Sequence, residues 1–257
     1  TQELKKLFGS EVPFDTPKPS RLLEKILELS TNKDEDCFVL DFFAGSGTMA
    51  QAIFNKNIKD NGKRKFILVQ IPEPTIKKSK AYEQGYKFVS EIGKERIRRV
   101  IKQIEKEQKE KSKQKKLTKE KEVNLDLGFK VFKLDKSNYK IWEKYEGKDG
   151  KELKKQLELF KTPLISGYKN EAVIYECIIK EGYSLNSKIE KTDVKSNKVF
   201  KVTDGDLFFY ISLDQEIKDK TITELKLKKE NMFICLDEAL NDSKKKNLSI
   251  QCNLKVI

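Results

Sequence analysis

The sequence predicts an α/β protein with three parallel strands and covering helices, followed by a smaller α+β domain. Apolar runs at residues 38–40, 66–71 and 128–134 alternate with stretches of helical spacing, the order expected of parallel strands joined by helices. A glycine-containing turn then marks a boundary, so we expect domains at residues 1–147 and 148–257. The length of 257 residues is enough for one large domain or two modest ones.

Helical spacing predicts most of the first domain. A short helix precedes Gly9, and further helices are expected at residues 20–29, 48–57 and 82–107. The apolar face of the second helix is expected to be mostly core: Leu22, Leu23, Ile26, Leu27 and Leu29. Residues 105–122 are mostly Lys and Glu, which indicates either a solvated continuation of the last helix or a mobile linker.

Three strands complete the first domain. Residues 66–71 are almost continuously apolar, so we expect this strand to be buried on both faces, as parallel strands are. The third strand, at residues 128–134, ends at Asp135. In the second domain, helical spacing around residues 153–160 and 172–179 predicts two helices. Short apolar runs there predict strands at residues 199–202, 207–213, 232–236 and 248–257.

The most informative stretch is residues 38–48, where an apolar run ends at Asp41 and a loop of small residues leads into a helix. Ligands of α/β sheets bind at the carboxyl ends of strands, against helix N-termini. Gly45 and Gly47 allow the backbone to approach a ligand with no side chain in between. We therefore expect Asp41 at the strand tip, facing a bound molecule.

Two other interpretations of this loop stay open. Gly45, Gly47 and Ala50 also fit the G-x-G-x-x-G/A pattern of dinucleotide sites, which calls for an acid at the tip of the next strand. That tip carries Gln70 instead, with Glu73 slightly beyond. The remaining interpretation is a tight strand-to-helix turn that binds no ligand.

Residues 41–48, Asp-Phe-Phe-Ala-Gly-Ser-Gly-Thr, resemble the D-P/F-F-A-G-S-G-T motif of amino-group DNA methyltransferases that bind S-adenosylmethionine. Residues 16–23 resemble the T-x-K-P-x-x-L-L segment that precedes this motif in the family. Further segments resemble the modification (Mod) subunit of type III restriction-modification systems: residues 64–73, 85–86, 91–99, 128–135, 137–138 and, in the C-terminal region, 233–239. The resemblance implies a partial Rossmann-like, S-adenosylmethionine-dependent methyltransferase sheet.

The same resemblance implies a set of cofactor-binding residues: Thr16, Lys18, Pro19, Asp41, Phe43, Gly45, Gly47, Thr48, Gln70 and Glu73. The strand tip and glycine loop would line the methionine and sugar side of S-adenosylmethionine. Thr48 would cap the helix or bond the carboxylate of the ligand. Gln70 stands where many relatives keep an acid for the ribose hydroxyls, and Glu73 would share that task.

Methyl transfer from S-adenosylmethionine is a direct displacement that demands positioning and needs no metal. The target adenine must be flipped out of the duplex. In the family resembled, a D/N/S-P-P-Y/F/W motif holds this base, but no two of the six prolines here are adjacent. We therefore expect the C-terminal part of a DNA adenine-N6 methyltransferase subunit, with the cofactor half of the site, no catalytic residues of the base half, and no activity alone.

Two further functions remain possible on the sequence. A non-catalytic, basic DNA-binding or subunit-assembly module would carry a degenerate glycine loop, and would not bind S-adenosylmethionine. A nicotinamide-dependent enzyme would bind NAD in its place, although none of the surrounding segments resembles a dehydrogenase. Binding of S-adenosylmethionine separates the leading hypothesis from both.

Composition limits the other possibilities. The net charge of +13 suits double-stranded DNA as a partner. A general bias of the composition towards lysine would produce the same charge without a DNA partner. The chain has no histidine and four widely spaced cysteines, so we expect no metal site, no His-based triad, and buried reduced thiols. With no signal-like segment and no apolar stretch of spanning length, we expect a cytoplasmic protein without a membrane partner.

The resemblance also implies partners for a complete subunit. These are a restriction (Res) subunit and a second copy of the full modification subunit, with residues 150–257 as a possible region for dimerisation or docking. The DNA sequence that is recognised does not follow from this chain, because the segment expected to recognise it precedes the T-x-K-P segment in this class.

Overall fold

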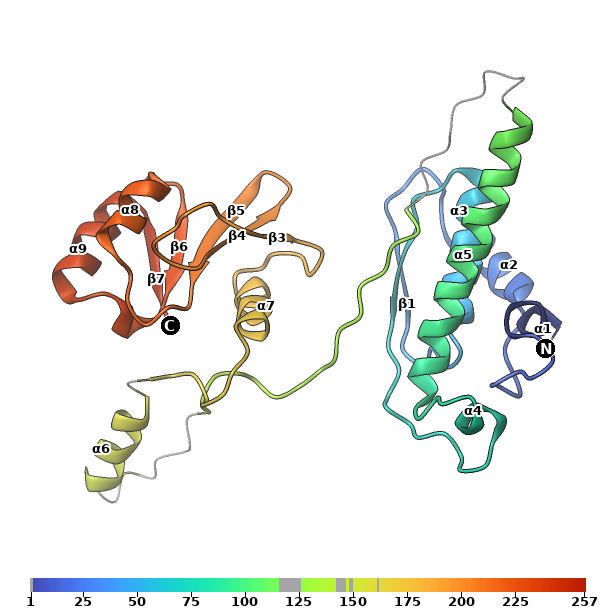
Figure 1. Cartoon of the computed structure of the whole chain (residues 1–257), viewed down its shortest axis with the longest axis horizontal. Helices are drawn as coiled ribbons and strands as arrows, with labels where there is room; N and C mark the ends of the chain where they lie inside the picture. Colours follow the sequence, from blue (N-terminus) through green and yellow to red (C-terminus); the bar gives the residue numbers. More distant parts are fainter. Residues whose placement is uncertain (1, 116–125, 142–146, 148–149, 161) are drawn as a thin grey trace. The chain divides into compact units, whose positions relative to one another are not determined.

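A computed structural model describes residues 2–115, 126–141, 147, 150–160 and 162–257. The chain divides into two compact units, Thr1–Phe129 and Lys130–Ile257, each described by itself below (Figure 1). The division after Phe129 lies earlier in the sequence than the boundary predicted between residues 147 and 148. Within the described residues, no helix is both long enough and apolar enough to cross a membrane.

The first unit contains a parallel pair of strands and several helices: α1 (Gln2–Phe8), α2 (Ser20–Ser30), β1 (Phe38–Asp41), α3 (Thr48–Asp60), β2 (Lys65–Leu68), α4 (Lys80–Glu83) and α5 (Val89–Lys115). In the register of the pair, Val39 lies opposite Phe66 and Leu40 lies opposite Ile67. The mixed α/β character and the first two strands are confirmed.

Helices cover one face of this sheet. Val39 and Phe66 pack against buried residues of α2 and α3, among them Leu27 and Ile53. α3 and α5 lie side by side, and their contact buries Phe54 and Val100 in a second cluster (Figure 1). This packing orients α3, whose first residue follows directly on the loop after β1.

The opposite face of the sheet is open. Its apolar side chains are between 47% and 64% exposed: Phe38, Leu40, Phe42, Ile67, Val69 and Ile71. The prediction that residues 66–71 are buried on both faces is therefore wrong, because the described chain supplies helices to one face only. α2 packs on the sheet through Leu23 and Leu27, so Leu22, Ile26 and Leu29 are exposed rather than core. We call the six sheet residues the open sheet face.

Two other predictions for this unit are wrong. The helix expected at residues 82–107 is interrupted after α4, where Gly85 takes a left-handed φ of 87°, and α5 begins only at Val89. The strand expected at residues 128–134 is not formed, and Leu134 is 99% exposed. A strand needs a neighbour for its backbone hydrogen bonds, and apolar composition does not provide one. Residues 105–115 continue α5, whereas residues 116–122 lie outside the described chain.

The second unit is an α+β domain built of α6 (Gly150–Leu159), α7 (Asn170–Lys180), β3 (Lys188–Lys191), β4 (Val199–Asp204), β5 (Leu207–Ser212), α8 (Asp219–Leu225), β6 (Met232–Cys235), η1 (Asp237–Ala239), α9 (Asp242–Gln251) and β7 (Asn253–Val256). Its sheet has the order β3-β4-β5-β6-β7, in which β3 to β5 are antiparallel and β5 to β7 are parallel. The two predicted helices are confirmed as α6 and α7. Residues 248–251, predicted as strand, belong to α9.

Candidate functional site

The loop between β1 and α3 is a tight elbow formed by residues 43–48, which we call the glycine elbow. Gly45 and Gly47 both have left-handed backbones, with φ of 52° and 74°. The N–H of Ala44 donates to the carbonyl of Val69 at 3.1 Å, and the N–H of Gly47 donates to the carbonyl of Ala44 at 2.8 Å. Positive φ is strained for residues with a Cβ, so glycine suits both positions.

The elbow packs directly on α5 at Gly93. A Cβ on Gly47 would lie 3.2 Å from the carbonyl oxygen of Gly93, and a Cβ on Gly93 would lie 3.1 Å from that of Gly45. Both distances are shorter than ordinary van der Waals contact. The close approach of the two backbones therefore depends on glycine on both sides, and it fixes the elbow against α5.

Arg96 of α5 lies beneath the elbow and is fully buried, with 0% of its surface exposed. One terminal nitrogen donates to Ser46 Oγ at 2.9 Å and to Thr48 Oγ1 at 2.6 Å. The other terminal nitrogen and Nε donate to Gln51 Oε1 at 2.8 and 3.0 Å. Burial lowers the pKa of Arg96 to about 10, and the Glu3 carboxylate 3.8 Å away acts in the opposite direction. The guanidinium therefore stays charged at neutral pH.

Several predicted site residues meet at the elbow. Asp41 ends β1, and its Oδ1 accepts from the N–H of Phe43 at 3.2 Å. The Phe43 side chain is 79% exposed. Gln70 Oε1 accepts from the N–H of Gly45 at 2.7 Å, so this amide holds the loop. The Thr48 side chain is buried on Arg96, and no side-chain oxygen among the described residues caps α3, whose N-cap is Gly47.

The other predicted site residues lie on neighbouring loops. Thr16, Lys18 and Pro19 are exposed in the turn before α2, and Glu73 is exposed after β2. Two hydrogen bonds and an ion pair link this turn to Arg96 beneath the elbow, because the N–H and Oγ of Ser20 donate to Glu3 at 3.2 and 2.9 Å. Glu3 in turn faces Arg96.

Sequence reasoning missed Arg96 and its partners Glu3, Ser46 and Gln51. One signal was present: Arg96 lies four residues from both Ile92 and Val100, so helical spacing places it on the buried face of α5. A charged residue in the middle of an apolar stripe needs polar partners within reach. The spacing alone does not say which partners these are.

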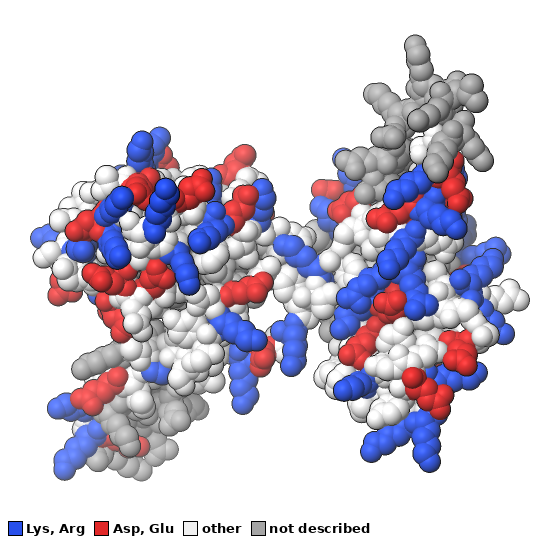
Figure 2. All heavy atoms as spheres, in the orientation of Figure 1, with Lys and Arg blue, Asp and Glu red and all other residues white. Residues whose placement is uncertain are grey.

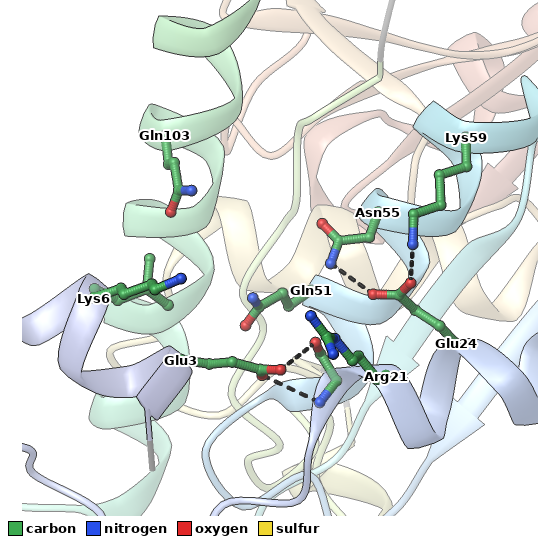
Figure 3. A pocket seen from close by; sticks show the side chains of 10 residues that line it. Glu3, Lys6, Arg21, Glu24, Gln51, Asn55, Lys59 and Gln103 are labelled. Atoms are coloured by element: carbon green, nitrogen blue, oxygen red, sulfur yellow. Dashed lines mark hydrogen bonds and ion pairs between the residues drawn. The ribbon is translucent and has the colours of Figure 1, made fainter.

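A polar cavity of about 270 Å³ lies among α1, α2, α3 and α5 (Figure 3). Glu24 occupies its wall, accepting from Asn55 at 2.8 Å and from Lys59. Its lining reaches Gln51 but includes none of the elbow residues. The elbow is therefore not part of this cavity.

Comparison with protein families matches residues 2–81 to the family described as DNA methylase. This segment includes all ten predicted cofactor-binding residues. It also covers the elements of the first unit from α1 to β2, including β1, the glycine elbow and α3. The match covers less than half of the chain, and it ends before Arg96.

Characterised relatives extend the comparison. The chain is 42% identical over 132 residues to the Mod subunit of the type III restriction-modification enzyme StyLTI of Salmonella typhimurium, covering 51% of this chain and 18% of that protein. It is 46% identical over 102 residues to the EcoPI Mod subunit of Escherichia phage P1, covering 40% and 15%. It is 31% identical over 210 residues to the EcoP15I Mod subunit of Escherichia coli, covering 81% and 28%. The predicted relation to a part of such subunits is confirmed, and the chain spans far less than the length of these relatives.

Proposed function

We propose that this chain, a relative of part of the Mod subunits of type III restriction-modification enzymes, is the S-adenosylmethionine-binding portion of a DNA adenine-N6 methyltransferase. The observation that carries the proposal is the glycine elbow, which combines a strand tip, left-handed glycines and a helix start inside the segment that matches DNA methylases. The proposal includes the finer fold assignment, a partial Rossmann-like methyltransferase sheet.

The residues present fit such a cofactor. The Ser46 and Thr48 side chains are held on Arg96 beneath the elbow, so they do not fill its outer side. The Asp41 carboxylate and the exposed Phe43 ring lie at the elbow to contact a ligand, and the half-buried Gly45 backbone lies beside the Phe14 ring, 3.6 Å from where a Cβ would stand. When bound, S-adenosylmethionine supplies an activated methyl group on its sulfonium. The elbow's task is to hold this group in place for an incoming amine.

The half of the site that binds the target base belongs to other polypeptide in this proposal. The chain contains no pair of adjacent prolines, and it spans at most 28% of the relatives compared above. The open sheet face is the surface that such polypeptide would cover, since parallel sheets are normally covered on both faces. Hence we expect the isolated chain to bind cofactor and to transfer no methyl group.

Double-stranded DNA, a restriction subunit and a second modification subunit are the proposed partners of the complete protein. Exposed basic residues follow one side of α5, at Arg98, Lys102, Lys106 and Lys109. On the face that Figure 2 shows, Lys and Arg lie among Asp and Glu rather than in an unbroken basic field. Charge on this face therefore supports general attraction to phosphates and gives no information on sequence readout.

Calorimetric titration of the chain with S-adenosylmethionine tests the proposal. We expect saturable binding, weakened at least about tenfold by Gly47→Ala, because its Cβ would meet Gly93 and its φ of 74° is strained for alanine. Gly85→Ala is the matched control, since Gly85 also has positive φ but has open space around it. It should leave the affinity unchanged. Absence of binding at millimolar ligand would contradict the proposal and favour an assembly module.

A further inference from the structure

Arg96 brings a buried positive charge to within hydrogen-bonding distance of the elbow. Its four hydrogen bonds all go to neutral acceptors, which are two hydroxyls and one amide oxygen. The carboxylate of Glu3 is 3.8 Å away, and that side chain is 33% exposed and also accepts from Ser20. The charge of Arg96 is therefore only partly neutralised within the protein.

The position of this charge matters for a ligand at the elbow. The hydroxyls that Arg96 holds belong to Ser46 and Thr48, on either side of the N-cap Gly47. α3 begins at the same turn, and the unpaired N–H groups of a helix start favour an anion. A buried cation acts through a low local dielectric, so its field there is stronger than that of a surface lysine.

We propose that Arg96 is a positioning residue that makes the glycine elbow favour ligands with a carboxylate at the start of α3. This inference rests on the proposed function, in which the carboxylate is that of the methionine part of S-adenosylmethionine. Arg96 does not touch the ligand. It is held beneath the elbow by Ser46 and Thr48, and its charge attracts the anionic end of the ligand.

The experiment compares two ligands on the full chain by calorimetry: S-adenosylmethionine and its decarboxylated form, which keeps the sulfonium, the adenosine and the amine. We expect Arg96→Gln to weaken the first about tenfold and the second less than about twofold, because only the first has a carboxylate. Arg96→Lys keeps the charge and should therefore bind S-adenosylmethionine with most of the affinity of the unmodified chain. Arg64→Gln is the matched control, since Arg64 is 4% exposed and bonded to Thr31 and Asp60, away from the elbow.

A variant at Glu3 keeps the inference falsifiable if Arg96→Gln does not fold. Glu3→Gln removes the anion beside Arg96, so we expect S-adenosylmethionine to bind about twofold tighter and the decarboxylated ligand to bind as before. Equal losses for both ligands in Arg96→Gln, or weaker binding of S-adenosylmethionine alone in Glu3→Gln, would overturn the inference. Failure of the unmodified chain to bind either ligand would instead overturn the proposed function, and this inference with it.

Discussion

Gln70 holds the glycine elbow through its side-chain amide. Its Oε1 accepts from the N–H of Gly45 at 2.7 Å, and the ribose contact expected of this residue stays a prediction. We predict that Gln70→Ala weakens S-adenosylmethionine binding about fivefold, since a lost hydrogen bond of this kind is worth about 1 kcal/mol. Gln70→Glu keeps the acceptor and should bind nearly as well as the unmodified chain. Equal losses in the two variants, measured by calorimetry, would show that the acceptor is not what matters.

Cys235 makes the stability of the second unit depend on pH. The thiol is 0% exposed, and burial raises its pKa from 9.0 to about 12. Above pH 9 the unfolded chain loses this proton and the folded chain keeps it. The contribution to stability is therefore complete below pH 9 and is lost as pH rises towards 12.

The corresponding prediction compares Cys235→Val with the unmodified chain in urea unfolding at pH 8 and pH 10.5. We expect the unmodified chain to lose about 2 kcal/mol more than the variant over this interval. Parallel losses in the two proteins would mean that Cys235 is not the titrating group. The expectation of buried, reduced thiols is confirmed for Cys177, Cys235 and Cys252, while Cys37 is partly exposed.

At the scale of elements, the two faces of β1 should respond in opposite ways to the same substitution. Val39 packs against α2 and α3, whereas its neighbour Leu40 is 58% exposed. We predict that Val39→Thr lowers the free energy of unfolding by about 1 to 2 kcal/mol, and that Leu40→Thr changes it by less than about 0.5 kcal/mol.

We also expect the open sheet face to promote self-association of the chain, and Leu40→Thr to reduce it, because the substitution makes this face more polar. Urea unfolding and light scattering of the two variants check these outcomes. A large loss of stability in Leu40→Thr would show that this face is covered by the chain itself.

The sequence predicted well those elements whose signals are local. The helices at α2, α3, α6 and α7 and the strands β1 and β2 follow from spacing and apolar runs. The strand at residues 128–134 was wrong because strand pairing depends on a neighbour elsewhere in the chain. α9 has Leu248 as its buried apolar residue and several lysines, so it gave little periodic signal. The elbow was predictable from its glycines, whereas the contact with Arg96 depends on how α5 packs.

At the scale of the whole molecule, the proposed function implies a cofactor site without a base site. The elbow is complete in itself, held by Gln70 from one side and by Arg96 from below. In the proposed function, further polypeptide covers the open sheet face and supplies the Pro-Pro motif that this chain lacks. Cofactor binding and methyl transfer should therefore be separable in this chain.

Transfer of labelled methyl groups from S-adenosylmethionine to unmethylated genomic DNA tests this central claim most directly. The chain alone should incorporate no label, and a mixture with the remaining part of a type III Mod subunit, supplied as a separate polypeptide, should incorporate it. Replacing the chain in that mixture with Gly47→Ala should abolish the incorporation. Label transferred by the chain alone, or a mixture that stays inactive although the chain binds cofactor, would contradict the account.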